Sequence, residues 1–160
     1  YQHFCSHAHT PPARRSDVPA ILRKGRVIYF AHPVFSTFAQ VGMPFYKGVV
    51  LNALRMLIPN PLVQTDAPST LQVTWNRQPA HGRSVVHLLH YIPEKRTLGA
   101  EYLEDVIPLY NVPLRLRTKP PKRVYLAPQR EEMGFQMDGD YLCLTVPEVR
   151  GHQLVVLEEG

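Results

Sequence analysis

Residues 25–58 read GRVIYFAHPVFSTFAQVGMPFYKGVVLNALRMLI, and this stretch decides how the chain is organised. Its first part, residues 26–31, is short, apolar and rich in β-branched and aromatic residues, which predicts a buried strand after a turn at residues 24–25. Its second part, residues 44–58, is long enough for about four helical turns. A strand that leads into a helix is half of an α/β layer unit. Because only one such unit occurs, we expect it to be partial.

The predicted helix is amphipathic, with an apolar face of residues that recur at helical spacing. That face consists of Tyr46, Val49, Val50, Ala53, Leu54 and Leu57. The opposite side is a narrow polar stripe of Gly48, Asn52 and Arg55. Pro44 suits the first turn of a helix, and Pro59 ends it. Upstream, Phe35 and Phe38 lie three positions apart and predict a helical turn that Gly42 ends.

After residue 60, the apolar residues no longer recur at helical spacing but at every second position, as in a strand. Two prolines flank Asn60 and predict a boundary there, between a partial α/β unit at 1–60 and a C-terminal β domain at 61–160. Strands are expected at 71–76, 84–92, 112–118, 124–126, 135–137, 141–146 and 154–157. Asp138-Gly139 is a strong hairpin signal, and Pro113 suggests an edge strand. Residues 93–103 read as irregular.

Many short strands separated by regular turns predict an antiparallel β-sandwich of seven or eight strands, so the fold class is mostly β. The chain has 160 residues, of which 44% are hydrophobic, which is enough for a real core. Sixteen prolines also favour short strands over long helices. No apolar run approaches the roughly 20 residues of a membrane span, so no membrane association is expected.

Charge and cysteine usage limit the partners and the compartment. The net charge of +5 comes from dispersed basic residues rather than one patch, so nucleic acid is not an expected partner. Cys5 and Cys143 form no disulfide framework and no CxxC motif, which favours a reducing compartment such as the cytoplasm. No glycine-rich phosphate loop occurs, and no cofactor is expected.

The residues offer few candidates for chemistry. His3, His7 and His9 lie close together near the start of the chain, but a metal site needs further ligands, so a polar loop or chain end is the preferred interpretation. His87 and His90 fall on opposite faces of one strand, so they cannot be joint metal ligands from that strand. One or both is expected to be a hydrogen-bonded core or interface residue.

An aromatic platform for a sugar is a further candidate, although strand aromatics more often belong to the core. Its members would be Trp75, Tyr91, Tyr102 and Tyr110. The carboxylates in loops and at the tail, including Glu158 and Glu159, are expected to be merely solvated. No pair has the arrangement of a glycosidase site, and no catalytic residue is assigned.

Five segments together resemble a known family. They are residues 3–11, 24–33, 52–59, 65–71 and 87–91. The sequence resembles the C-terminal end of bacterial glycoside hydrolases of the β-galactosidase/α-L-fucosidase-like superfamily. The resemblance implies a catalytic (β/α)8 barrel earlier in a parent chain, then an amidotransferase-like domain, also called the β-galactosidase trimerisation domain, and a terminal β-sandwich. Residues 1–60 would be the trailing part of that middle domain.

The resemblance implies a non-catalytic region that supports the barrel and the oligomer, with the carbohydrate substrate of the parent enzyme nearby. His3, His7 and His9 would then reach a neighbouring subunit or the substrate pocket. One alternative is a carbohydrate-binding β-sandwich with Trp75 or the 93–111 loop as its platform. A second alternative is a small metal-dependent enzyme that uses the three histidines.

Overall fold

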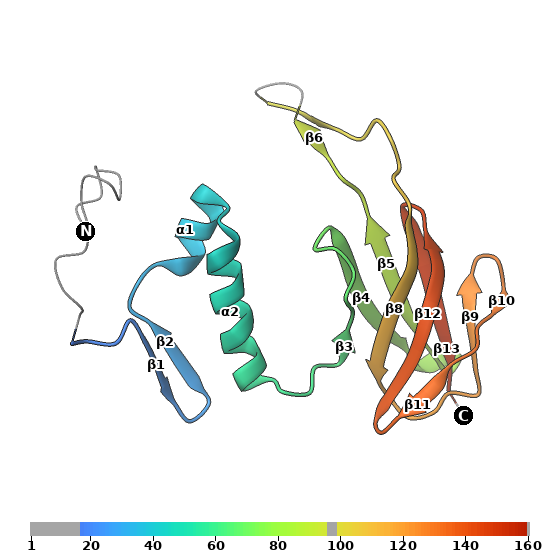
Figure 1. Cartoon of the computed structure of the whole chain (residues 1–160). Coiled ribbons are helices and arrows are strands. Elements are labelled where there is room, and N and C mark those ends of the chain that lie inside the picture. Colours follow the sequence, from blue (N-terminus) through green and yellow to red (C-terminus); the bar gives the residue numbers. More distant parts are fainter. Residues whose placement is uncertain (1–16, 96–98, 160) are drawn as a thin grey trace. The chain divides into compact units, whose positions relative to one another are not determined.

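The computed structural model describes residues 17–95 and 99–159. The chain divides into two compact units, of which the first ends at Asn60 and the second begins at Pro61 (Figure 1). Pro59 and Pro61 prevent the preceding helix from continuing across this point. Among the described residues, no helix is long and apolar enough to cross a membrane.

The first unit opens with a two-stranded antiparallel hairpin. Strands β1 (Ile21–Lys24) and β2 (Val27–Phe30) pair in register, with Ile21 opposite Phe30. The turn lies at Gly25 and Arg26, one residue later than predicted, because Lys24 still pairs with Val27. The prediction of a buried strand is wrong, because β2 alternates between exposed and half-buried residues. No third strand in the described part of the chain pairs with this hairpin.

Two helices follow the hairpin. Helix α1 (Val34–Val41) ends at Gly42, whose φ of 64° is left-handed and whose N–H donates to the Phe38 carbonyl over 2.8 Å. Glycine adopts this conformation without the steric cost that a side chain would add. Helix α2 (Pro44–Leu57) begins at its proline, as predicted. Its half-buried residues are Tyr46, Val49, Val50, Ala53 and Leu57, which are five of the six predicted for the apolar face.

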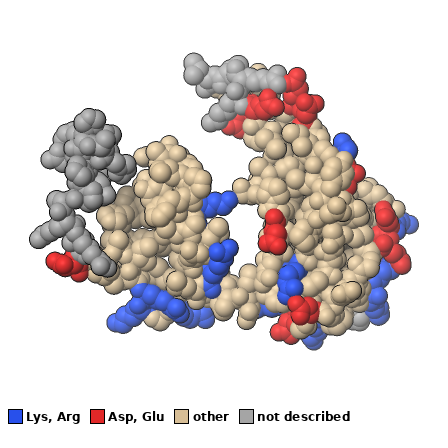
Figure 2. Space-filling model, in the orientation of Figure 1, with Lys and Arg blue, Asp and Glu red and all other residues tan. Residues whose placement is uncertain are grey.

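The first unit leaves much of its apolar surface in contact with solvent. Only Val34 is buried in α1, and α2 buries no residue. Phe35 is 66% exposed, Phe45 69% and Val27 65%. Uncharged surface dominates the visible face of this unit, with basic residues at its lower and right-hand margins (Figure 2). Such patches mark surfaces that bind other protein.

The second unit is built from two antiparallel sheets. The larger has the strand order β10-β9-β13-β5-β4 and the smaller β11-β12-β8-β3. The strands are β3 (Val63–Gln64), β4 (Leu71–Gln78), β5 (Arg83–His90), β8 (Leu109–Arg117), β9 (Arg123–Ala127), β10 (Glu131–Glu132), β11 (Gln136–Asp138), β12 (Tyr141–Val149) and β13 (His152–Glu158). The predicted mostly β, antiparallel fold is confirmed, and short strands such as β3 and β10 were not predicted.

One hydrophobic core lies between the two sheets. The larger sheet contributes alternate residues of its central strands, such as Val86 and Leu88 of β5, and the smaller sheet contributes Leu114 and Leu116 of β8. All four side chains are at most 1% exposed. The period of two predicted from the sequence is therefore the period of burial.

Two local predictions need correction. Residues 93–103 are not wholly irregular, because β6 (Glu94–Lys95) pairs with β7 (Glu101–Tyr102). Strand β8 is not a simple edge strand, since β12 pairs with its whole length and β3 pairs with Arg115 and Leu116. At Pro113, which has no N–H, the ladder with β3 is absent, and the Thr65 hydroxyl donates to the Pro113 carbonyl over 2.7 Å.

Candidate functional site

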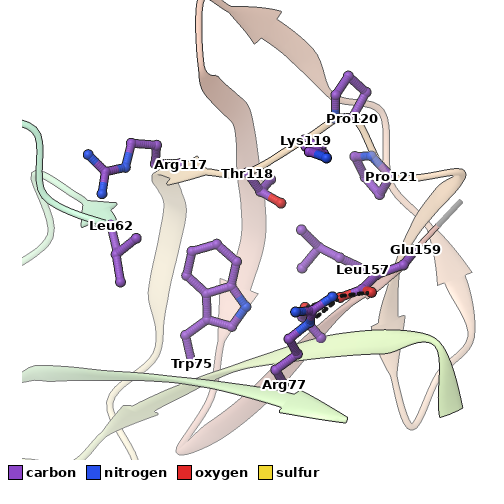
Figure 3. A pocket seen from close by; sticks show the side chains of 11 residues that line it. Leu62, Trp75, Arg77, Arg117, Thr118, Lys119, Pro120, Pro121, Leu157 and Glu159 are labelled. Carbon is purple, nitrogen blue, oxygen red and sulfur yellow. Dashed lines mark hydrogen bonds and ion pairs between the residues drawn. The ribbon is translucent and has the colours of Figure 1, made fainter. Parts of the chain in front are cut away.

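A cavity of about 740 Å3 opens at one margin of the second unit. The residues that line it come from the segment before β3, from β4, β5 and β13, and from the turn after β8 (Figure 3). Backbone hydrogen bonds fix its walls: the Arg117 N–H donates to the Leu62 carbonyl over 2.8 Å, and the Glu159 N–H to the Gly82 carbonyl over 2.7 Å. The cavity therefore lies among segments that are far apart in the sequence.

Trp75 forms the aromatic part of the lining. It follows Leu71 and Val73 on the inward face of β4, where it is half-buried and packs against the core. Its indole lies between Leu62 and Leu157 in the cavity (Figure 3). The residue therefore does two things: part of the ring stabilises the sandwich, and the remainder is presented to the cavity. Tyr91, Tyr102 and Tyr110, the other predicted platform residues, do not line it.

A bidentate ion pair forms a second part of the lining. Arg77 Nε donates to Glu159 Oε1 over 2.9 Å, and Arg77 Nη2 to Glu159 Oε2 over 2.8 Å. The hydrogen bond from Arg77 lowers the pKa of the Glu159 carboxyl from its usual value, and the same bond raises the pKa of Arg77. The paired planar groups hold a fixed polar surface beside the indole.

Arg117 and Lys119 bring positive charge to the cavity. Both side chains are exposed, and neither has a carboxylate partner among the described residues. Arg115 and Arg123 differ in this respect, because each lies 2.8 Å from a carboxylate, that of Asp138 and that of Glu158 respectively. Glu159 is the one carboxylate of the lining, and Arg77 already neutralises it, so the cavity has an excess of positive charge.

The composition of the lining favours binding over hydrolysis. A glycosidase site needs two carboxyl groups on either side of the scissile bond. Here a single carboxylate lies in an ion pair, while an aromatic ring, a hydroxyl of Thr118 and cationic groups surround the cavity. These groups can hold a polar ligand with an apolar face, but they lack an acid and a base for cleavage.

The predicted histidines have different outcomes. His3, His7 and His9 lie outside the described residues. His87 of β5 and His152 of β13 have near-parallel rings, with Nδ1 of the first 3.2 Å from Nε2 of the second. His90 is only 2% exposed, yet neither of its ring nitrogens has a hydrogen-bond partner among the described residues. Of the two histidines, His87 is therefore the one with the expected hydrogen-bond partner.

A metal centre has no support in the described part of the chain. Nowhere between residues 17 and 95 or between 99 and 159 do three or more histidine, cysteine, aspartate or glutamate side chains gather as metal ligands.

The sequence predicted Trp75 as a site residue but not the residues that lie beside it in the cavity. Arg77 and Glu159 are 82 positions apart, and only the pairing of strands brings them together. The expectation that Glu158 and Glu159 are merely solvated is wrong, because each bonds an arginine. Outward-facing Arg117 was visible in the alternation of β8, but the pattern gave no sign of which residues would face it.

Both units of the chain resemble part of a solved glycoside hydrolase. The chain is similar to alpha-L-fucosidase isoenzyme 2 from Paenibacillus thiaminolyticus, with a TM-score of 0.90 and 37% sequence identity. The similarity covers 100% of this chain and 25% of the fucosidase chain. No protein-family model and no curated protein matches the sequence.

The structural similarity confirms the resemblance on which the sequence interpretation rested. It extends over both units, and it is consistent with a C-terminal region of such an enzyme. The chain spans a quarter of the length of the fucosidase.

Proposed function

We propose that this chain is a non-catalytic accessory and assembly region of a bacterial glycoside hydrolase. The observation that carries the proposal is the similarity of the whole chain to one quarter of an α-L-fucosidase. The cavity supports it, since the lining has no second carboxylate for hydrolysis. The partners are then the catalytic (β/α)8 barrel of the same parent chain, further copies of the enzyme and its carbohydrate substrate, in the cytoplasm.

The exposed apolar surface of the first unit supports the assembly role. We assign residues 1–60 to the trailing part of an amidotransferase-like domain and residues 61–160 to the terminal sandwich. Side chains such as Phe35 and Phe45, which are 66% and 69% exposed, would be covered by the rest of that domain or by a neighbouring subunit.

The test separates catalysis from assembly. The 160-residue chain should not hydrolyse an aryl α-L-fucoside, whereas the parent enzyme should. In the parent enzyme, Phe45→Ser should reduce the oligomer seen by light scattering, while Lys47→Ser on the same helix should leave it unchanged. Hydrolysis by the chain alone, or an intact oligomer and unchanged thermal stability in the Phe45 variant, would refute the proposal.

The three histidines have a specific place in this proposal. We infer that His3, His7 and His9 contact the substrate pocket or a neighbouring subunit in the parent enzyme. Replacement of all three by alanine should then raise the KM or weaken the oligomer. Unchanged turnover together with unchanged assembly would remove this part of the proposal.

A further inference from the structure

We propose that the cavity at Trp75 binds an acidic saccharide, with the sugar ring on the indole and a sulfate or carboxylate group bound by Arg117 or by Lys119, whose side chains point to different sides of the cavity (Figure 3). The inference rests on the proposed function in one respect, because a region of a glycoside hydrolase works in the presence of glycans. The site itself is assigned from the residues that line the cavity.

The shape and apolar lining fit a sugar ring. Binding cavities for small ligands have volumes of roughly 300–1,000 Å3, and this one measures about 740 Å3. Trp75 supplies a broad apolar face, and such a ring buries a large area at low cost in conformational entropy. Because Trp75 is anchored in the core through its position on β4, its face is already held in place before a ligand arrives.

The polar groups fit the hydroxyls of a saccharide. Arg77 and Glu159 fix one another through two hydrogen bonds of 2.9 and 2.8 Å, so their remaining donors and acceptors have defined directions. Arg77 and the indole project from β4 on one side of the cavity, Glu159 meets Arg77 from the end of β13, and the segment with Thr118 crosses the opposite side (Figure 3). A sugar that stacks on Trp75 would therefore be flanked by polar groups.

The charge selects an acidic ligand over a neutral one. Arg117 and Lys119 lie two positions apart at the end of β8 and in the following turn, and both border the cavity (Figure 3). Arg115 and Arg123 on the same unit are paired with carboxylates, whereas these two are not. A guanidinium and an ammonium are the side chains that bind sulfate and carboxylate groups.

A nucleic acid is a poorer fit for the same surface. Single-stranded nucleic acids bind along grooves that carry several aromatic side chains for successive bases. This cavity has one aromatic residue and a lining that includes Leu62, Leu157 and two adjacent prolines. One stacked ring with one acid group beside it matches the lining more closely.

The experiment uses the fact that Trp75 is the sole tryptophan of the chain, so its fluorescence reports on this cavity alone. The 160-residue protein is titrated with four probes of similar length: a sulfated oligosaccharide, a uronic-acid oligosaccharide, a neutral oligosaccharide and a polyphosphate without sugar. We expect a saturable change in emission with at least one of the acidic saccharides. The saccharide that binds more tightly identifies the acid group.

The variants test the role of charge. Arg117→Gln/Lys119→Gln should weaken binding about tenfold or more, since the loss of one charged hydrogen bond to the acid group already accounts for roughly that factor. The matched control, Lys24→Gln/Arg26→Gln, removes the same charge from the β1–β2 hairpin and should leave the affinity unchanged. Both pairs of residues are exposed, so each variant should fold like the parent protein, which circular dichroism checks.

Several outcomes would overturn the assignment. They are no binding of either acidic saccharide, equal binding of the neutral one, an equal change in Trp75 emission with polyphosphate, or an unchanged affinity in the double variant. Hydrolysis and assembly of the parent enzyme test the proposed function independently of this titration. A negative titration with normal assembly would therefore remove the saccharide site and leave the accessory role.

Discussion

Glu158 and Glu159 are neighbours in sequence, yet their side chains lie on opposite faces of the larger sheet. Successive residues of a strand point to opposite sides, and the two carboxylates continue this alternation at the end of β13. Glu158 bonds Arg123 over 2.8 Å, and Glu159 bonds Arg77 over 2.8 Å. One arginine comes from β9 and the other from β4, so the two ion pairs connect β13 to strands on both sides of it.

Acid should remove this connection. Hydrogen bonds from the arginines lower the pKa values of Glu158 and Glu159 below the ordinary 4.5. Their stabilisation is therefore complete above about pH 4.5 and is lost as the pH falls through the folded-state pKa values. In urea unfolding at pH 7 and pH 3, Arg77→Gln should be less stable than the wild type at pH 7, with a smaller difference at pH 3. A difference that grows in acid would contradict this assignment.

Gly151 lies in the turn between β12 and β13, in a conformation and at a position that leave no room for a side chain. Its φ of 71° is left-handed, and a Cβ atom there would lie 2.6 Å from the hydroxyl oxygen of Tyr91. Gly151→Ala should therefore lower the free energy of unfolding by about 1–2 kcal/mol. Gly134→Ala is the matched control, because nothing lies within 4 Å of its Cβ position and its φ is not in the left-handed region. Equal stabilities of the two variants would refute the prediction.

Successive residues of β5 lie in the core and on the outer face of the larger sheet. Leu88 is 0% exposed in the core, while the next residue, Leu89, is 37% exposed on the outer face. Leu88→Ala should destabilise the protein by about 3 kcal/mol through lost burial and a residual cavity. Leu89→Ala removes the same atoms and should cost less than about 1 kcal/mol. Thermal and urea unfolding of both variants measure this difference, and equal losses would contradict the assigned faces.

The elements and the hairpin of β11 and β12 at Asp138-Gly139 were largely predictable, and the pairing of strands distant in sequence was not. The alternation of Leu71, Val73 and Trp75 gave the inward face of β4, and the spacing from Tyr46 to Leu57 gave the half-buried face of α2. Local periodicity contains this information. The two-residue strand β3 was missed because so short a segment has no period to detect.

The candidate site was less predictable than the elements. Trp75 was identified because tryptophan is a distinctive residue type. Arg77 and Glu159 became visible as part of a site only once β4, β5 and β13 were aligned. Pairing between distant strands depends on the complete core, which no single stretch of sequence encodes. The unpaired state of Arg117 is likewise a property of its surroundings.

At the scale of the whole molecule, the two units differ in how well they bury their own apolar side chains. The second unit has a closed core of residues at or near 0% exposure, while the two helices of the first bury only Val34. Such a contrast is expected if the second unit is a domain with its own core and the first unit is part of a larger domain.

The contrast predicts where a hydrophobic dye will bind. The 160-residue chain should enhance the fluorescence of anilinonaphthalene sulfonate, and a variant that begins at Pro61 should lose most of that enhancement. The shorter variant should nonetheless unfold cooperatively in urea, because its core is contained within it. Equal dye binding by the two proteins would show that the apolar surface of the first unit is not accessible.

The position of β13 has a kinetic consequence. This strand comes last among the strands in sequence, yet it lies in the middle of the larger sheet, where Val155 pairs with Val86 on one side and with Leu126 on the other. The hairpin of β4 and β5 and the hairpin of β9 and β10 are therefore joined only through it. Until β13 inserts, neither hairpin has its neighbour, and closing so long a loop is slow, on the order of milliseconds to seconds. We therefore expect the larger sheet to be complete only when β13 has paired on both sides. A ligand or partner that requires the finished cavity will bind only after that pairing.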